Sequence, residues 1–308
     1  MGKVVILGIF MADTAYRADR LPRIGETLPG RGFMLGPGGK GSNQAVACAR
    51  IGAETHIVTR LGQDDFAGMA QATWAAAGVT GHVRQVADSH TGAAFIFVDD
   101  ATGDNAIIIA PGAAAGIGPA DVQAQAGLIG TADVFVTQLE QPVEAAARGL
   151  EIARQAGVTT ILNPAPAAAL PPGMLALCDY ATPNETEAEA LTGMAVDSDA
   201  TAGRAAERLR EMGVGCPIIT LGARGVWMHG HGLVPAITAG AVVDTTGAGD
   251  AFNGGFAAAL SQGLDPEQAV RVGCATAGLA VTRPGTAASM PTGAEVRALM
   301  ADPSLGAV

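Results

Sequence analysis

Short runs of buried-strand character alternate with amphipathic-helix patterns along most of this 308-residue chain. The strand runs are continuous and rich in Val and Ile, which is typical of parallel strands covered on both faces. We expect strands at residues 3–9, 54–62, 132–140, 158–166, 178–185 and 216–222. Helical patterns lie between them at residues 41–52, 64–77, 119–130, 142–156, 184–192 and 199–213. The alternation predicts an α/β fold with a mainly parallel sheet and helices on both faces.

Two segments interrupt this rhythm. Residues 91–112 have the pattern of a hairpin with a turn near 101–104, and residues 16–39 combine short strand-like pieces with many turn residues. Both predict a small accessory sheet outside the main one. The carboxyl-terminal part is helical at residues 249–262, 266–281 and 293–301. Because no repeat, low-complexity linker or charge run divides the chain, we expect one domain with a small β lid.

The composition excludes several classes of partner. The chain is 49% hydrophobic and 15% charged, with a net charge of −11. This acidity argues against nucleic acid and against an anionic membrane surface. The amino-terminal apolar run is short and lacks a small-residue cleavage site, so it predicts a buried strand rather than a signal peptide. Prolines in the charge-poor stretch 155–178 exclude a spanning helix there. We therefore expect a soluble, cytoplasmic protein.

The cysteines and histidines do not predict a metal site. Cys48, Cys178, Cys216 and Cys274 lie far apart in the sequence and form no CxxC pair. This spacing indicates reduced, mostly buried thiols rather than a disulfide framework or a zinc site. No HExxH motif is present, and the short turn around His229 and His231 favours loop residues over metal ligands.

The stretch AVVDTTGAGDAFNGG, residues 241–255, predicts an anion site. We expect a strand to end here in a glycine loop, followed at once by a helix. Glycines allow close approach to their N–H groups, and a helix start supplies free donors and a positive dipole end. Asp250 places a carboxylate beside this site. That arrangement is repulsive, so it requires a functional reason.

A second glycine-rich stretch, LGPGGKGSNQAVA at residues 35–47, has two nucleotide-binding interpretations. The glycines match G-x-G-x-x-G, but the first strand of the fold does not precede them and Pro37 lies inside the motif. A P-loop is excluded because Lys40 is followed by Gly41 rather than by Ser or Thr. The remaining interpretation is a glycine-lined helix start. Its polar residues Lys40, Ser42 and Asn43 can bind a hydroxylated ligand.

Two further stretches have both a structural and a functional interpretation. In ATPNETEAEALTG, residues 181–193, Thr182 or Asn184 caps a helix whose acidic first-turn residues Glu185 and Glu187 stabilise the helix dipole. Alternatively, Asn184 and Glu187 lie on one helical face and hold hydrated Mg²⁺. In ITLGARGVW, residues 219–227, a strand runs through a glycine turn into another strand. It is either an ordinary hairpin or, with Thr220 and the following loop, the lining of a nucleotide site at the carboxyl edge of the sheet.

Taken in order, GGKGSNQAVA, NPAP, TPNETEAE, TLGARG and DTTGAGDAFNGG resemble the ribokinase (PfkB-type) family of carbohydrate kinases. The resemblance covers essentially the whole chain. It implies a single kinase domain over residues 1–308 with a three-layer fold and lid strands contributed by about 10–38 and 91–110. It also implies ATP-dependent phosphorylation of a sugar hydroxyl, with D-ribose as the first candidate, and a homodimer formed through the lid.

The resemblance assigns roles by position. Asp250 is the base that deprotonates the sugar hydroxyl, and the N–H groups of Gly247, Ala248 and Gly249 stabilise the transferring phosphoryl group. The sugar-binding positions are Met11, Asp13, Gly39, Lys40, Gly41, Ser42, Asn43, Glu140 and Asp250. The nucleotide-binding positions are Asn184, Thr220, Leu221, Gly222, Ala223, Arg224, Gly225, Gly249 and Cys274. Glu187 organises Mg²⁺ through water, and the K⁺ positions are Asp244, Thr246, Ala280, Arg283, Gly285 and Ser289.

Two positions depart from the family pattern. Met11 stands where an Asn is usual, so a thioether replaces an amide that would bond a sugar hydroxyl. Cys274 replaces a His near the adenine, a mild change because adenine sites pack mainly through apolar contacts. The first departure leaves other substrates open, namely deoxyribose, a ketohexose, a keto-deoxy sugar acid or a nucleoside. A non-catalytic regulator that binds sugar or nucleotide is the alternative from another functional class.

Overall fold

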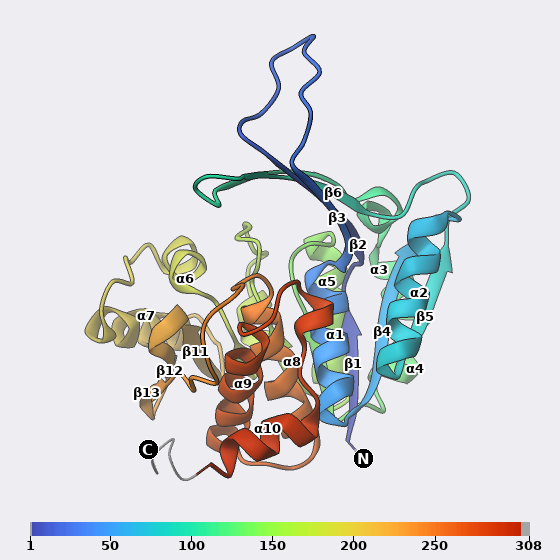
Figure 1. Cartoon of the computed structure of the whole chain (residues 1–308). Coiled ribbons are helices and arrows are strands. Elements are labelled where there is room, and N and C mark those ends of the chain that lie inside the picture. Colours follow the sequence, from blue (N-terminus) through green and yellow to red (C-terminus); the bar gives the residue numbers. More distant parts are fainter. Residues whose placement is uncertain (1, 303–308) are drawn as a thin grey trace.

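The computed structural model describes residues 2–302 and contains a nine-stranded sheet in the order β13-β12-β11-β10-β9-β8-β1-β4-β5 (Figure 1). Its strands are β1 (Lys3–Leu7), β4 (Glu54–Leu61), β5 (Val79–Gln85), β8 (Val134–Thr137), β9 (Thr159–Leu162), β10 (Tyr180–Ala181), β11 (Cys216–Thr220), β12 (Gly225–Met228) and β13 (Gly232–Pro235). Neighbouring strands from β5 to β11 pair in parallel, whereas β12 and β13 are antiparallel. The sheet therefore presents the carboxyl ends of its parallel strands along one edge.

Helices cover both faces of this sheet, which confirms the predicted α/β architecture. One face packs against α1 (Lys40–Ile51), α2 (Asp65–Ala77), α8 (Ala248–Ser261), α9 (Pro266–Ala280) and α10 (Gly293–Met300). The other face packs against α3 (Pro119–Ala124), α4 (Ala126–Ile129), α5 (Val143–Gln155), α6 (Glu185–Thr192) and α7 (Asp199–Glu211). Short 3₁₀ turns occupy Gly112–Gly116, Met174–Leu177, Gly222–Arg224 and Ala287–Ser289. Because β1 is buried on both faces, Val4 and Ile6 belong to one core and Val5 and Leu7 to the other.

A second, four-stranded sheet lies beyond the carboxyl edge of the main sheet (Figure 1). Its order is β3-β2-β6-β7, from β2 (Met11–Ala18), β3 (Gly32–Gly38), β6 (Ala93–Asp99) and β7 (Asn105–Ala110). The hairpin expected at residues 91–112 is formed by β6 and β7. Strand β2 follows β1 closely, so the first strand of the main sheet leads directly into the four-stranded sheet.

Several local predictions are wrong. The helix expected at 119–130 is divided at Gln125, and the strand expected at 178–185 is limited to Tyr180–Ala181 because the cap of α6 begins at Asn184. No strand precedes the glycine loop at Gly247: residues 236–246 are irregular and pass over α9, where Gly278 lies against the Ile237 carbonyl. Strands β5 and β13 were not expected: β5 mixes polar and apolar residues, and β13 has only four residues, of which two are Gly and Pro.

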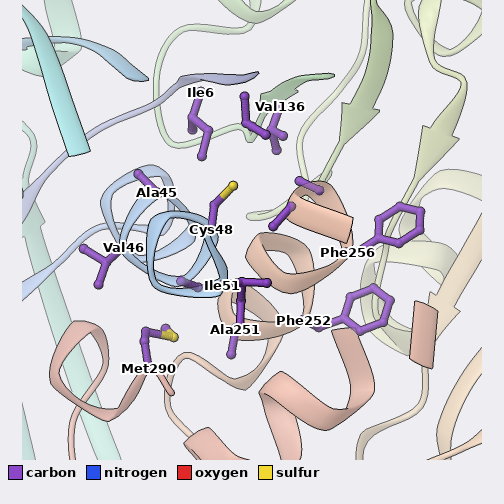
Figure 2. Packing of buried hydrophobic residues seen from close by; sticks show 14 of the residues in the cluster. Ile6, Ala45, Val46, Cys48, Ile51, Val136, Ala251, Phe252, Phe256 and Met290 are labelled. Atoms are coloured by element: carbon purple, nitrogen blue, oxygen red, sulfur yellow. The ribbon is translucent and has the colours of Figure 1, made fainter. Parts of the chain in front are cut away.

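Close packing of α1 on α8 brings the two glycine-rich motifs together. Figure 2 shows these helices side by side, with Ile6 and Val136 of the sheet on one side and Phe252 and Phe256 facing away from α1. A Cβ atom at Gly254 of α8 would lie only 2.5 Å from the Ala47 Cβ of α1. The absent side chain therefore permits a helix separation that a larger residue would prevent.

All four cysteines are free, and Cys216 is the one that is partly exposed. Within residues 2–302, no helix is both long and apolar enough to cross a lipid bilayer. The same residues contain no cluster of three or more His, Cys, Asp or Glu side chains able to hold a metal ion. The ends of the expected domain, residue 1 and residues 303–308, lie outside the described residues.

Candidate functional site

Polar residues gather where the parallel strands of the main sheet end. Gln138 follows β8, Asn163 follows β9 and Thr182 follows β10, while α8 begins at the same edge. A cavity of about 130 Å³ lies between them. It is lined by Lys40, Asn163, Ala165, Thr182, Asn184, Glu187, Thr220, Thr245, Gly247, Ala248, Gly249, Asp250 and Asn253. Residues from both glycine-rich motifs and from the TPNETEAE motif thus meet in one place.

Asp250 lies in the first turn of α8 and is 6% exposed. The turn is possible because Gly247 adopts a left-handed conformation with φ of 78°. The Asp250 carboxylate accepts hydrogen bonds from Asn43 Nδ2 at 3.0 Å and Gln44 Nε2 at 3.1 Å. Burial raises the pKa of Asp250, and the nearby Lys40 ammonium and these two amide donors oppose that rise.

Lys40 provides the positive charge of the cavity. Burial lowers the pKa of Lys40, but Asp250, Glu140 and Glu187 together outweigh that effect, so its pKa lies above the ordinary value. The backbone N–H of Lys40 donates to Glu140 Oε2 at 2.7 Å. Burial raises the pKa of Glu140 to about 7, against the opposing effect of Lys40. One lysine is therefore shared among three carboxyl groups.

Asp13 reaches this region from the four-stranded sheet. It lies on β2 opposite β3, where a Cβ atom at Gly38 would lie 2.0 Å from Asp13 Oδ2. Gly38 thus leaves room for the carboxyl group. Burial raises the pKa of Asp13 to about 6, and the negative charge of Asp250 adds to the rise. The interaction indicates that Asp13 and Asp250 face a common space.

Asn184 and Glu187 lie at the start of α6, as the helix-cap interpretation of their motif predicts. They form a capping box on α6: Glu187 N donates to Asn184 Oδ1 at 2.8 Å, and Asn184 N donates to Glu187 Oε2 at 2.9 Å. Yet Glu187 is buried and lines the cavity with Lys40 and Asp250. The cap uses only one of its two carboxylate oxygens, so the other can serve a ligand.

A second, more apolar cavity of about 370 Å³ adjoins the first. The two share Thr220, Thr245, Ala248 and Gly249. Of the other positions expected to bind nucleotide, Gly222, Ala223, Gly225 and Cys274 line the second cavity, and Asn184 lines the first. The remaining two line neither cavity. Leu221 is buried in the core, and the Arg224 guanidinium turns outward to Asp199 and Glu185, at 3.0 and 3.6 Å.

The positions expected to bind K⁺ form two adjoining loops. Asp244 joins them, because it accepts from Thr246 N and from Gly285 N, both at 2.9 Å. Burial raises the pKa of Asp244, but these backbone donors outweigh it and hold the pKa below the ordinary value. Ser289 is buried and donates to the Thr286 carbonyl. The Arg283 side chain pairs with Glu295, and Ala280 is the last residue of α9.

Three residues expected to contact the sugar or the phosphoryl group make other contacts in the structure. The hydroxyl of Ser42 is buried and accepts from Trp74 Nε1 at 2.9 Å, so it supports the core. The Ala248 N–H donates to the Thr245 carbonyl at 3.2 Å, which occupies one of the three donors expected at the anion site. Met11 is 4% exposed and belongs to the core on the α5 side of the sheet, with its sulfur against Gly92.

Sequence reasoning missed the buried amides beneath the carboxylate. Gln44, Gln138 and Asn163 are linked by hydrogen bonds, and Asn253 Nδ2 donates to the Gly249 carbonyl. Gln44 and Asn163 lie inside the motifs quoted for the resemblance, which was the available signal. Gln138 begins QLEQPVE, which also resembles the family, but its partner Gln44 comes from a distant part of the chain.

The model of the pfkB family of carbohydrate kinases matches residues 1–293. Among curated proteins, the ribokinase of Haemophilus influenzae is 38% identical over 292 residues, covering 94% of this chain and 95% of the relative. The deoxyribokinase of Salmonella typhi is 37% identical over 296 residues, covering 94% and 95%. The structure of Arabidopsis thaliana ribokinase complexed with ribose and ATP has a TM-score of 0.92 and 31% identity, covering 98% of this chain and 100% of that one.

Proposed function

The chain belongs to the pfkB family of carbohydrate kinases, and we propose that it phosphorylates D-ribose with ATP, giving ribose 5-phosphate. One observation carries the proposal. The Asp250 carboxylate and the amino-terminal turn of α8 lie at the junction between the apolar cavity and the acidic region around Asp13 and Glu140. At such a junction a phosphoryl donor and a hydroxylated acceptor can meet beside the carboxylate.

Asp250 acts as the general base. As the O5 oxygen attacks the γ-phosphorus, the hydroxyl proton passes to the carboxylate and the bond to the ADP oxygen breaks. The backbone N–H groups of Gly247 and Gly249 are the donors that this turn can offer the transferring group. Lys40 adds a positive charge beside it. Close placement of base and anion site is needed because acceptor and phosphate must meet in line.

The sugar lies between the four-stranded sheet and the start of α1. Asp13 and Glu140 accept hydrogen bonds from its hydroxyls, and the glycine loop 39–41 allows close approach. Asn43 supports this placement, because its Oδ1 atom is buried and has no hydrogen-bond partner in the structure. A buried acceptor of this kind is costly unless a ligand hydroxyl satisfies it.

The nucleotide occupies the apolar cavity, with adenine near Cys274 and its phosphates directed toward Gly249. The size and apolar lining of the cavity suit a flat base, and the polar cavity beside it suits phosphates. Glu187 and Asn184 hold hydrated Mg²⁺, for which a buried carboxylate with one free oxygen is a suitable partner. When bound, the metal would supply positive charge that offsets the charge of the phosphates.

The residues that would hold K⁺ are Asp244 and the backbone carbonyls of the two loops that it joins. The loop at Asp244 directly precedes the anion turn, and the second loop contains Thr286, whose hydroxyl donates to the Pro37 carbonyl at 2.8 Å. A bound cation would order this turn and so favour transfer. K⁺ suits such a site because it is satisfied by several neutral oxygens and needs no cluster of acidic side chains.

A second candidate substrate is 2-deoxyribose. Position 11 carries Met, so no amide is available there to bond a hydroxyl, and a sugar that lacks one hydroxyl leaves nothing unpaired. The similarity to a deoxyribokinase, 37% identical, also favours this candidate.

The four-stranded sheet serves as a lid and as the contact surface of a homodimer. Strand β7 is exposed along its whole length, including Ile107, Ile108 and Ile109, and β3 exposes Phe33 and Met34. An open edge strand with this apolar surface requires a cover, and a second copy can supply it. The free, mostly buried thiols suit a reducing compartment, the cytoplasm.

A coupled assay of ADP release with a panel of sugars tests the proposal. We expect sugar-dependent turnover with ribose or 2-deoxyribose, lost in Asp250→Asn. Binding of a sugar without turnover for any member of the panel would instead identify a regulator. Turnover with a ketohexose, a keto-deoxy sugar acid or a nucleoside would support the kinase activity but show that ribose is not the substrate.

A further inference from the structure

A chain of buried amide side chains leads from the end of β8 to the Asp250 carboxylate. Gln138 Nε2 donates to Gln44 Oε1 at 2.6 Å, and Gln44 Nε2 donates to Asp250 Oδ1 at 3.1 Å. The same Gln44 nitrogen donates to Asn163 Oδ1 at 3.2 Å, and Asn163 Nδ2 donates to the Thr182 carbonyl at 3.0 Å. Gln44 and Gln138 have no exposed surface, so bulk water does not compete for these bonds.

The direction of every amide in this chain is determined. A side-chain amide has one NH₂ group and one oxygen, and an ionised carboxylate only accepts. Because Gln44 directs its NH₂ group at Asp250 and Asn163, its oxygen must face a donor, and Gln138 supplies that donor. The Gln138 Oε1 atom is itself confined, because a Cβ atom at Gly8 or Gly41 would lie 2.5 or 3.0 Å from it, and it has no hydrogen-bond partner in the structure.

We infer that Gln44 is a positioning residue, which keeps the Asp250 carboxylate ionised and fixes its orientation, and that Gln138 fixes the amide of Gln44. The inference rests on the proposed role of Asp250 as the base. A buried carboxylate next to a phosphate site tends to take up a proton. Donors on both oxygens, Gln44 on Oδ1 and Asn43 on Oδ2, oppose this and restrict rotation of the group.

The test compares three Gln→Met variants that each remove one buried amide. Gln44→Met removes the donor to Asp250, Gln138→Met removes the group that orients Gln44, and Gln141→Met is the control. Gln141 is equally buried at the same edge but donates to Thr137 Oγ1 and the Gln138 carbonyl, not to Asp250. Loss of a buried amide therefore costs stability in all three, whereas only two affect the carboxylate.

Two readouts separate positioning from a merely structural role. The first is kcat and KM for sugar and ATP between pH 5.5 and 9. The second is the titration of Asp250 itself, followed by ¹³C NMR of carboxyl-labelled aspartate and identified by the signal lost in Asp250→Asn. The charged groups that face Asp250 are Lys40 of α1, Asp13 of β2, Glu140 after β8 and Glu187 of α6. None is changed in any variant.

In Gln44→Met we expect kcat to fall about 10- to 100-fold near neutral pH, as for loss of a hydrogen bond to a charged group, with both KM values nearly unchanged. The Asp250 titration and the acid limb of kcat should move to higher pH. Gln138→Met should show the same fall in kcat and the same shift of the titration to a smaller extent. Gln141→Met should show neither change. An unmoved titration in Gln44→Met, or equal effects in Gln141→Met, would overturn the inference.

The outcomes distinguish this inference from the proposed function. If the wild-type protein phosphorylates no sugar, the proposed function fails, whereas the NMR titration still tests the link between Gln44 and Asp250. If Gln44→Met does not fold, the titration of Asp250 in Gln138→Met decides, and an unmoved signal there counts against the inference.

Discussion

Replacing Gly254 with Ala tests whether the spacing of α1 and α8 sets the geometry of the candidate site. The new Cβ atom would lie 2.5 Å from Ala47 Cβ and 2.7 Å from the Gln44 carbonyl oxygen. Ordinary carbon contacts are roughly 3.5–4.0 Å, so the helices must separate by about 1 Å. Overpacking of this kind costs about 1–3 kcal/mol of unfolding free energy.

The same displacement moves Asn43 and Gln44 away from the Asp250 carboxylate, to which they donate. A misplacement of about 1 Å can lower the rate on the order of 100-fold. Urea unfolding and kcat for the preferred sugar measure the two effects. Gly68→Ala on α2 is the matched control, because its Cβ would meet no atom within 4 Å, and we expect it to be neutral or stabilising. If Gly254→Ala keeps the unfolding free energy and the kcat of the wild type, the reasoning is refuted.

Four further predictions follow from the site. Asp250→Asn should lower kcat by about 10²–10⁴-fold, while ATP binding measured by calorimetry persists. Activity within a few-fold of wild type would show that Asp250 is not the general base. Activity should rise when K⁺ replaces Na⁺ at constant ionic strength. Equal rates in the two salts would contradict the proposed K⁺ site. Burial raises the pKa of Asp13 from 3.8 to about 6, so the folded protein keeps this proton to a higher pH than the unfolded chain does. The wild-type protein therefore loses unfolding free energy as the pH rises from about 4 to above 6. Asp13→Asn should therefore raise the unfolding free energy by up to about 3 kcal/mol at pH 8 but not near pH 4, while it weakens sugar binding; no gain at pH 8 would contradict the assigned burial. Met11→Asn should raise the ratio of kcat/KM for ribose over that for 2-deoxyribose by up to about tenfold, at a cost in stability, and an unchanged ratio would show that position 11 does not face the sugar.

The sequence predicted those parts of the site that depend on local chemistry. A glycine loop followed by a helix start defines an anion site whatever the rest of the chain does, so Gly247 and Asp250 could be identified from one stretch. The order of strands and helices was equally local, because buried parallel strands have a recognisable composition. The strand expected before Gly247 failed for the opposite reason: its Val242 and Val243 are exposed, and packing on α9 decides the conformation.

The orientation of side chains could not be predicted in this way. Asn43 and Asp250 are 207 residues apart, and Gln138 meets Gln44 across 94 residues. Arg224 lies inside a matching motif, yet its guanidinium pairs with Asp199 on the outside. Matching a loop identifies the course of the backbone, whereas the direction of each side chain depends on neighbours that arrive from elsewhere in the fold.

The repulsive placement of a carboxylate beside an anion site has a consequence for catalysis. Asp250 shares one lysine with Glu140 and Glu187, and Asp13 adds a further negative charge. Burial nevertheless raises the pKa of Asp250, and the Lys40 charge and the amides of Asn43 and Gln44 oppose that rise. A higher pKa makes the ionised carboxylate a stronger base, provided that amide donors keep it ionised before the reaction. The burial that makes a carboxylate costly beside an anion site therefore strengthens the proton acceptor that phosphoryl transfer to a sugar hydroxyl requires.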